Sequence, residues 1–252
     1  MSSLTLSDGR TLAYADRGVP GGTPVFFHHG MPGSRLFAGL LDDPASETEV
    51  RVVVPDRPGY GRSDPAKASL NDFRADVEAL ADHLDFGGFR VAGFSGGGPF
   101  ALACGDIERV DRVALLSALA PGADTGLFGT LATRASPVLA FLFRISDAFA
   151  GIAPDVVATQ YTDCDVSDET REAVARDFRE GFRQGPGAAV RESRLFAEST
   201  PFVPDATISA WHGIEDGNAP LASVERLVGG APNATLERRR GDHLSTFPRS
   251  PQ

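Results

Sequence analysis

The stretch that most constrains this chain is Val91-Ala92-Gly93-Phe94-Ser95-Gly96-Gly97-Gly98-Pro99. Residues 90–94 are mostly apolar and favour a short strand, whereas residues 100–104 favour a helix. A serine between them would sit in a sharp strand-to-helix turn, and the glycines on either side remove side chains that would collide with neighbouring elements. Gly93-x-Ser95-x-Gly97 is the pattern of a nucleophile elbow, which raises the serine hydroxyl above a sheet at the start of a helix.

Short apolar segments alternate with helical patterns along most of the chain. A β-hairpin is expected at residues 4–14, where two alternating segments flank an Asp-Gly turn. Further strands are expected at 24–28, 50–54, 90–94, 110–116, 207–212 and 234–239, and helices at 34–41, 70–84 and 220–228. This alternation predicts an α/β fold with a mostly parallel twisted sheet and helices on both faces.

The alternation stops at Pro121 and resumes after Pro204. The intervening residues lack strand patterns and contain an apolar segment at 130–149 and helical patterns at 168–184 and 188–198. We therefore expect two parts, an α/β core formed by residues 1–120 and 205–252 and an all-helical cap formed by residues 121–204.

Composition narrows the classes of function. The net charge of -10 argues against nucleic-acid binding, which needs a basic surface. No apolar run approaches the roughly 18 residues that span a membrane, and the N-terminus lacks a signal-peptide pattern, so a cytoplasmic protein without membrane contact is expected. Two cysteines are too few for a disulfide framework, and Cys104 is expected in the core. Neither a metal-ligand spacing nor a cofactor motif is present, so neither is predicted.

Three polar residues that could form a catalytic triad each follow an expected strand. Ser95, Asp216 and His243 each lie just past the expected end of a strand, where open α/β sheets build their sites. Serine needs an adjacent base, and a carboxylate fixes the imidazole that serves as that base. We expect these three as a catalytic triad. Less favoured alternatives for the acid are Glu215, Asp124 and Asp242, the last because it would point away from its neighbour His243.

Several segments together resemble the α/β-hydrolase superfamily over nearly the whole chain. They are the elbow, His28-His29-Gly30-Met31-Pro32-Gly33, Asp56-Arg57-Pro58-Gly59-Tyr60-Gly61-Arg62-Ser63, Gly213-x-x-Asp216-x-x-x-Pro220 and Asp242-His243. The resemblance is closest to small-molecule esterases, prolyl iminopeptidase-like enzymes and C–C bond hydrolases. It implies an oxyanion hole formed by the backbone N–H groups of Met31 and Gly96. Separately from the resemblance, we expect His28 and His29 to be structural.

The resemblance implies a serine hydrolase that needs no cofactor and cleaves a small, largely apolar ester, lactone or thioester. Cleavage of a C–C bond or of an N-terminal proline peptide is the alternative, and the peptidase would use acidic cap residues such as Asp163, Asp165 and Asp168. A cyclase or ligand receptor on the same fold is the alternative from another class.

Other expectations concern the surroundings of the site. An apolar substrate pocket is expected from Phe94, Phe128, Leu131, Leu139, Phe141 and Phe143. Adjacent Asp56 and Arg57 are expected to pair with each other. The cap arginines could bind a substrate carboxylate, but a solvated face paired with Glu172, Asp177 and Glu180 is the more usual role. Pro248 and Pro251 disfavour the helix that relatives carry after His243, so a second subunit, as in a homodimer, is one way to cover the sheet there.

Overall fold

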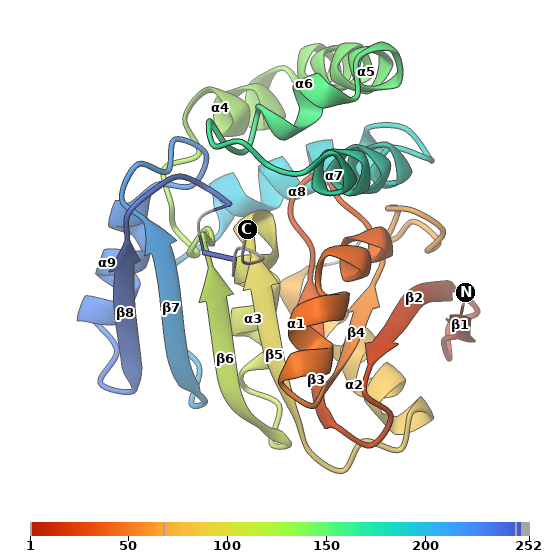
Figure 1. Cartoon of the computed structure of the whole chain (residues 1–252), viewed down its shortest axis with the longest axis vertical. Helices are drawn as coiled ribbons and strands as arrows, with labels where there is room; N and C mark the ends of the chain where they lie inside the picture. Colours follow the sequence, from red (N-terminus) through yellow and green to blue (C-terminus); the bar gives the residue numbers. More distant parts are fainter. Residues whose placement is uncertain (1, 68, 245, 248–252) are drawn as a thin grey trace.

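The computed structural model describes residues 2–67, 69–244 and 246–247. Among these residues one mixed sheet of eight strands runs in the order β1-β2-β4-β3-β5-β6-β7-β8 (Figure 1). The strands are β1 (Ser2–Thr5), β2 (Thr11–Gly18), β3 (Thr23–His28), β4 (Val50–Pro55), β5 (Phe89–Phe94), β6 (Val110–Leu116), β7 (Thr207–Gly213) and β8 (Ala234–Arg239). The first two pair antiparallel, as does β2 with β4, and every later pairing is parallel. The predicted α/β class with a mostly parallel sheet is confirmed.

Strand register brings two important loops together. His28 at the end of β3 pairs with Gly93 near the end of β5, so the loop that follows β3 begins beside Ser95. The strands β6, β7 and β8 continue the parallel part of the sheet, so their C-terminal ends lie at the same edge. Polar residues that follow these strands therefore meet above one edge, although they are far apart in sequence.

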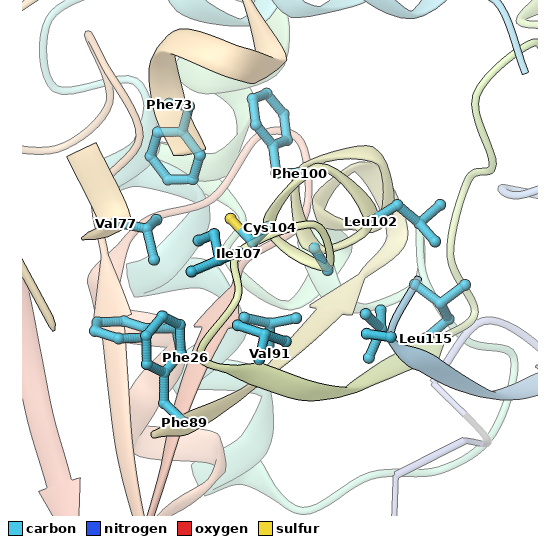
Figure 2. Close-up of a cluster of buried hydrophobic side chains, with 14 of the residues drawn as sticks. Phe26, Phe73, Val77, Phe89, Val91, Phe100, Leu102, Cys104, Ile107 and Leu115 are labelled. Carbon is cyan, nitrogen blue, oxygen red and sulfur yellow. The ribbon is translucent and has the colours of Figure 1, made fainter. Parts of the chain in front are cut away.

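Successive strand residues point to opposite faces of the sheet, and both faces carry apolar side chains that helices cover. Phe26, Val53 and Val91 pack against α2 (Leu70–His83), α3 (Gly98–Cys104) and α9 (Leu221–Gly229). Their neighbours Phe27, Val54 and Ala92 pack on the opposite face, against the 3₁₀ helix η1 (Arg35–Leu40) and the short helix α1 (Asp42–Glu47). The sequence patterns did not indicate α1. Figure 2 shows the first cluster, in which the Cys104 thiol is fully buried as expected.

Capping residues explain where two of the helices begin. Ser69 accepts a hydrogen bond from Asp72 N, and Asp72 accepts one in return from Ser69 N, which forms a capping box at the start of α2. Ser34 accepts a hydrogen bond from Leu36 N at the start of η1. Serine is among the residues preferred at the start of a helix, because its hydroxyl can accept a hydrogen bond from a free backbone N–H group.

Between β6 and β7 the chain forms helices alone. They are α4 (Gly126–Arg134), α5 (Ser136–Ile152), α6 (Asp155–Ala158), α7 (Asp168–Gly181) and α8 (Gly187–Glu198). The apolar segment expected at 130–149 is divided between α4 and α5, because Ala135 leaves the helical conformation and Pro137 lies in the first turn of the next helix. Figure 1 shows these helices over the edge at which the parallel strands end. They have a core of their own, built from residues such as Leu139, Phe143 and Phe178.

The described part of the chain after β8 packs on the sheet. Leu244 and Phe247 join the cluster around η1, and the Phe247 ring lies 5.1 Å from that of Phe94. The expectation that Pro248 and Pro251 disfavour a terminal helix concerns residues outside those described. In the part that is described, the helices are too short or too polar to cross a membrane.

Candidate active site

Ser95 occupies the sharp turn between β5 and α3. Its backbone φ is +52°, a left-handed conformation that is strained for a residue with a side chain. A Cβ atom on Gly97 would lie 2.1 Å from the carbonyl oxygen of His28, and one on Gly93 would lie 2.5 Å from Gly97 O. The two glycines of the pattern are therefore required because β3, β5 and the helix start approach so closely.

Asp216 and His243 form a hydrogen-bonded pair at the same edge of the sheet. His243 Nδ1 lies 2.8 Å from Asp216 Oδ2, and both side chains are buried. Burial alone would raise the pKa of Asp216, but the hydrogen bond and charge of His243, with the N–H groups of Ala219 and Asn218, outweigh it and hold that pKa below its usual value. An ionised Asp216 places the proton of neutral His243 on Nδ1, which leaves Nε2 as a hydrogen-bond acceptor.

Nε2 of His243 is buried and has no hydrogen-bond partner among the described residues. The ring centroid of His243 lies 4.7 Å from that of Phe94, the residue before Ser95. No hydrogen bond joins Ser95 to His243 in the described part of the chain, and such bonds are often long in ligand-free enzymes. A buried, unpaired imidazole nitrogen is costly and calls for an explanation, such as a catalytic role.

The other carboxylates considered as the acid lie elsewhere. Asp124 accepts a hydrogen bond from Gly126 N in a turn of the cap, and Glu215 is exposed. Asp242 points away from His243 as expected, and its Oδ2 accepts hydrogen bonds from Thr162 Oγ1 at 2.6 Å and Asp163 N at 2.8 Å. Asp242 thus joins the loop that carries His243 to the cap.

Sequence reasoning did not single out His212 or Tyr161 for this site. His212 is buried with Nε2 3.3 Å from Asp216 Oδ2 and 3.0 Å from Ala219 O, and burial lowers its pKa. Tyr161 stacks on His243 with ring centroids 6.0 Å apart. His212 could have been found from the sequence, because it lies four residues before Asp216 at the end of a strand. Tyr161 lies in an irregular segment whose sequence gives no such signal.

The loop after β3 brings Met31 beside Gly96. A Cβ atom on Gly96 would lie 3.3 Å from Met31 N, so the two backbones adjoin directly next to Ser95. The carbonyl oxygen of Gly30 accepts a hydrogen bond from Arg57 Nη2 at 3.0 Å and lies 2.8 Å from His29 Nδ1. Because C=O and N–H of one trans peptide point in opposite directions, anchoring Gly30 O fixes the direction of the Met31 N–H.

Arg57 is the centre of a buried ionic network. It is fully buried and pairs with Glu192 of α8, with Nε to Oε1 at 2.6 Å and Nη2 to Oε2 at 2.9 Å. Tyr60 also donates to Glu192 at 2.9 Å. Burial opposes the charge of Arg57, but the facing Glu192 carboxylate outweighs it and raises the pKa of Arg57.

The expected pairing of Asp56 with Arg57 is wrong. Asp56 pairs instead with Arg35 at 2.8 Å, and Arg35 also contacts Glu180 of α7 at 2.8 Å. Adjacent residues at the end of a strand point in opposite directions, so Asp56 and Arg57 each form an ion pair with a residue from another element. Both networks join the core to the cap.

A small cavity of about 20 Å³ lies at this site, little more than the space for one water molecule. Its lining comes from the loop after β3, from β5, from η1, from the cap and from the loop after β8, and consists of Gly30, Pro32, Phe37, Phe94, Tyr161, Val174, Asp177, Phe178 and Leu244. Gly30 adjoins Ser95, since a Cβ atom on Gly30 would lie 3.5 Å from that of Ser95.

Of the six residues expected to line the pocket, Phe94 alone does so. Leu139 and Phe143 are buried in the core of the cap, and Leu131 packs against that core. Phe128 and Phe141 are 53% and 62% exposed on the outside of the cap. These five do not line this cavity, because the inner faces of α4 and α5 contact other cap helices, whereas α7 and Tyr161 approach the site.

The charged residues of the cap do not converge on this cavity, with the exception of Asp177. Asp163 and Asp165 line a separate open hollow of about 290 Å³ together with Arg171, and Asp168 is exposed. Arg171 pairs with Asp165, Arg194 with Glu198, and Arg191 donates to Pro58 O. Asp177 is not a partner of the surface arginines, contrary to expectation; its Oδ1 accepts from Ser34 N at 2.9 Å and Ser34 Oγ at 2.7 Å.

Asp177 makes the stability of the cap contact sensitive to pH. Burial raises the pKa of Asp177 to about 7, although hydrogen bonds from Ser34 oppose the shift. A carboxyl with a raised folded-state pKa binds more protons when folded than when unfolded between about pH 4 and 7, so stability falls as the pH rises through that window.

We therefore expect Asp177→Asn to have the unfolding free energy of the wild type near pH 4 and to exceed it by a few kcal/mol at pH 8. Asparagine keeps the acceptor for Ser34 and has no charge to bury. Urea midpoints at the two pH values measure this difference, and comparison of the two proteins cancels the titration of every other group. Equal midpoints at pH 8 would contradict the assignment.

Comparison with known proteins shows what this chain is similar to. Residues 23–137 match the family model described as the alpha/beta hydrolase fold. A non-heme chloroperoxidase of Streptomyces lividans is 36% identical over 129 residues, which cover 48% of this chain and 46% of that relative, less than half of its length. A 2-hydroxy-6-oxononadienedioate/2-hydroxy-6-oxononatrienedioate hydrolase of Cupriavidus pinatubonensis is 25% identical over 92% of this chain and 85% of its own. A thermophilic esterase from Thermogutta terrifontis shares the fold with a TM-score of 0.69 at 20% identity, covering 96% of this chain and 91% of its own. This chain has the α/β-hydrolase fold, and residues 23–137 are similar to the family described by that name.

Proposed function

We propose that the protein is a serine hydrolase that cleaves a small, largely apolar carboxylic ester, lactone or thioester through Ser95, His243 and Asp216. The observation that carries the proposal is the buried 2.8 Å contact between His243 Nδ1 and Asp216 Oδ2, with Nε2 unpaired beside the turn that holds Ser95. A buried carboxylate in that position fixes the imidazole tautomer that can accept a proton from a serine.

The reaction proceeds by acyl transfer. His243 Nε2 takes the Ser95 proton as the oxygen attacks the substrate carbonyl, and the N–H groups of Met31 and Gly96 bind the developing oxyanion. The imidazolium then donates its proton to the leaving alcohol or thiol, and the acyl group stays on Ser95. Water attacks the acyl-enzyme with His243 again as base, which releases the acid and restores the serine.

The cavity supports a small and mainly apolar acyl group. Phe37, Phe94, Val174, Phe178 and Leu244 supply apolar walls next to Ser95 and His243. Its volume of about 20 Å³ is too small for a whole substrate, so larger esters require the cap to move.

Hydrolysis of a C–C bond next to a carbonyl is the second candidate. The relative that matches 92% of this chain is a hydrolase of a 2-hydroxy-6-oxo dienedioate and trienedioate, and that match favours this candidate. Such dianionic substrates need cationic contacts. The residues that line the cavity include no lysine, arginine or histidine, and apart from Tyr161 their one ionisable side chain is the acidic Asp177. We therefore prefer the ester.

A panel of p-nitrophenyl esters of graded chain length tests the proposal, with a vinylogous 1,5-diketone as the C–C substrate. We expect ester turnover to be highest for the shortest acyl groups and to fall as the chain lengthens. Cleavage of the diketone without cleavage of any ester would favour the second candidate. Failure to cleave either by the folded protein would favour a cyclase or receptor.

A further inference from the structure

The outer helix of the cap exposes a stripe of large apolar side chains. On α5 the exposed members of this stripe are Val138, Phe141, Leu142, Ile145, Phe149 and Ile152. At 3.6 residues per turn all six fall within an arc of roughly 100°, which is the width of a helix face that packs on a neighbour. The buried side chains Leu139, Phe143 and Ala150 lie on the other side of the helix, against the cap core.

The size of this surface matches that of an interface. Leu127 of α4 and Val156 of α6 are also exposed and flank α5 in sequence, whereas Phe128 stacks on Phe143, on the side of α5 that faces the cap core. A monomer typically exposes an apolar patch of a few hundred Å² at most. The six large side chains of the stripe, with roughly 100 Å² exposed on each, supply most of the ~800 Å² per partner that a standard interface buries.

The spacing of the stripe is symmetric about Ile145. Val138 and Ile152 lie seven residues to either side, and Phe141 and Phe149 lie four residues to either side. In an antiparallel pair of α5 helices centred on Ile145, each Phe141 would face a Phe149 and each Val138 an Ile152. A surface of this kind is complementary to itself under a two-fold axis, as an isologous dimer requires.

Charges beyond the ends of the stripe are complementary in the same arrangement. Arg134 is exposed just before α5, and Asp155 is exposed just after it. Antiparallel pairing brings the start of one helix to the end of the other, so Arg134 of each copy lies near Asp155 of its partner. Opposite charges at a polar rim favour this alignment over the parallel one, which would bring like charges together.

We propose that α5 is the centre of a symmetric dimer, in which it packs antiparallel against α5 of a second copy of this chain. A membrane surface fits the helix less well. Helices that bind membrane surfaces have polar faces rich in lysine and arginine, whereas α5 carries a single arginine, Arg144, and the acidic Asp147, on a chain with a net charge of -10. Figure 1 shows α5 at the edge of the molecule farthest from the sheet, where a second copy can approach.

Sedimentation of the full chain at micromolar concentration tests the dimer. The wild type is expected at twice the monomer mass of 26.6 kDa, and Phe141→Glu/Phe149→Glu at the monomer mass, with a dissociation constant raised at least 100-fold. Val203→Glu, which changes an exposed apolar residue outside the cap helices, is the matched control and should remain dimeric. Circular dichroism confirms that each variant is folded.

Disulfide trapping tests the alignment itself, in a Cys164→Ser background because Cys104 is buried. Ile145→Cys lies on the two-fold axis and should cross-link to its own copy under mild oxidation. Val138→Cys should not, because its equivalents lie about 20 Å apart along the paired helices. Together, Val138→Cys and Ile152→Cys should cross-link when present on different copies.

A monomeric wild type at tens of micromolar would overturn the proposal, as would a dimer that Ile145→Cys fails to trap. Co-sedimentation of a monomeric chain with phosphatidylcholine vesicles would also overturn it, because the stripe would then contact lipid. These outcomes are independent of whether Ser95 is catalytic.

Discussion

Replacement of Ser95 by alanine is expected to lower kcat for any cleaved ester by about 10⁴-fold or more. The hydroxyl is the atom that attacks the carbonyl in the proposed mechanism, and no neighbouring group can replace it. The remaining rate would come from the oxyanion contacts alone. Initial rates at saturating ester measure the effect.

The control for this variant has to separate loss of chemistry from loss of fold. Ser95→Ala keeps a Cβ atom at φ +52° and should unfold like the wild type. Ser95→Gly removes that Cβ from a strained backbone and should be at least as stable and equally inactive. Ser46→Ala, at an exposed serine of α1, should keep full activity. Activity within tenfold of the wild type in Ser95→Ala would mean that another group is the nucleophile.

Replacement of Arg57 by methionine is expected to lower the free energy of unfolding by about 3–5 kcal/mol. The substitution leaves the Glu192 carboxylate buried without its cation and removes donors from the carbonyls of His29 and Gly30. Turnover should fall as well, because the Met31 N–H loses the anchor that fixes its direction. Urea unfolding and ester kinetics on the same samples measure both effects.

Two further variants separate these causes. Arg57→Met/Glu192→Met removes both charges and should recover most of the stability, because no unpaired ion remains, but it should stay slow in turnover. Arg194→Met breaks the exposed pair with Glu198 on the same helix and should cost less than about 1 kcal/mol. A loss below 1 kcal/mol in Arg57→Met would show that the network contributes little.

The fold was predictable because short local sequence patterns determine most of its strands, helices and turns. Apolar strands, helix caps such as Ser69 and the glycines around Ser95 each act within a few residues. The order of Ser95, Asp216 and His243 could be interpreted because parallel strands end at one edge of a sheet. The structure pairs Asp216 with His243, as this reasoning proposed. The catalytic role of the two residues stays a prediction.

Other features depend on contacts that no local pattern encodes. Arg57 and Glu192 are 135 positions apart, and neither sequence context distinguishes that partner from the adjacent Asp56. The expected pocket residues on α5 lie away from the cavity because α5 is apolar on two faces, of which one forms the cap core and the other is exposed. Asp177 looked like a solvated helix residue, yet its burial against Ser34 is set by how α7 sits on the core.

The most direct test of the account is covalent labelling with a fluorophosphonate, followed by mass spectrometry of the digested protein. We expect one adduct, on the peptide that contains Ser95, with labelling slowed by His243→Ala and Asp216→Asn and abolished by Ser95→Ala. Labelling at a different residue, or a folded protein that does not react at any concentration of the probe, would contradict the proposal that Ser95, His243 and Asp216 act together.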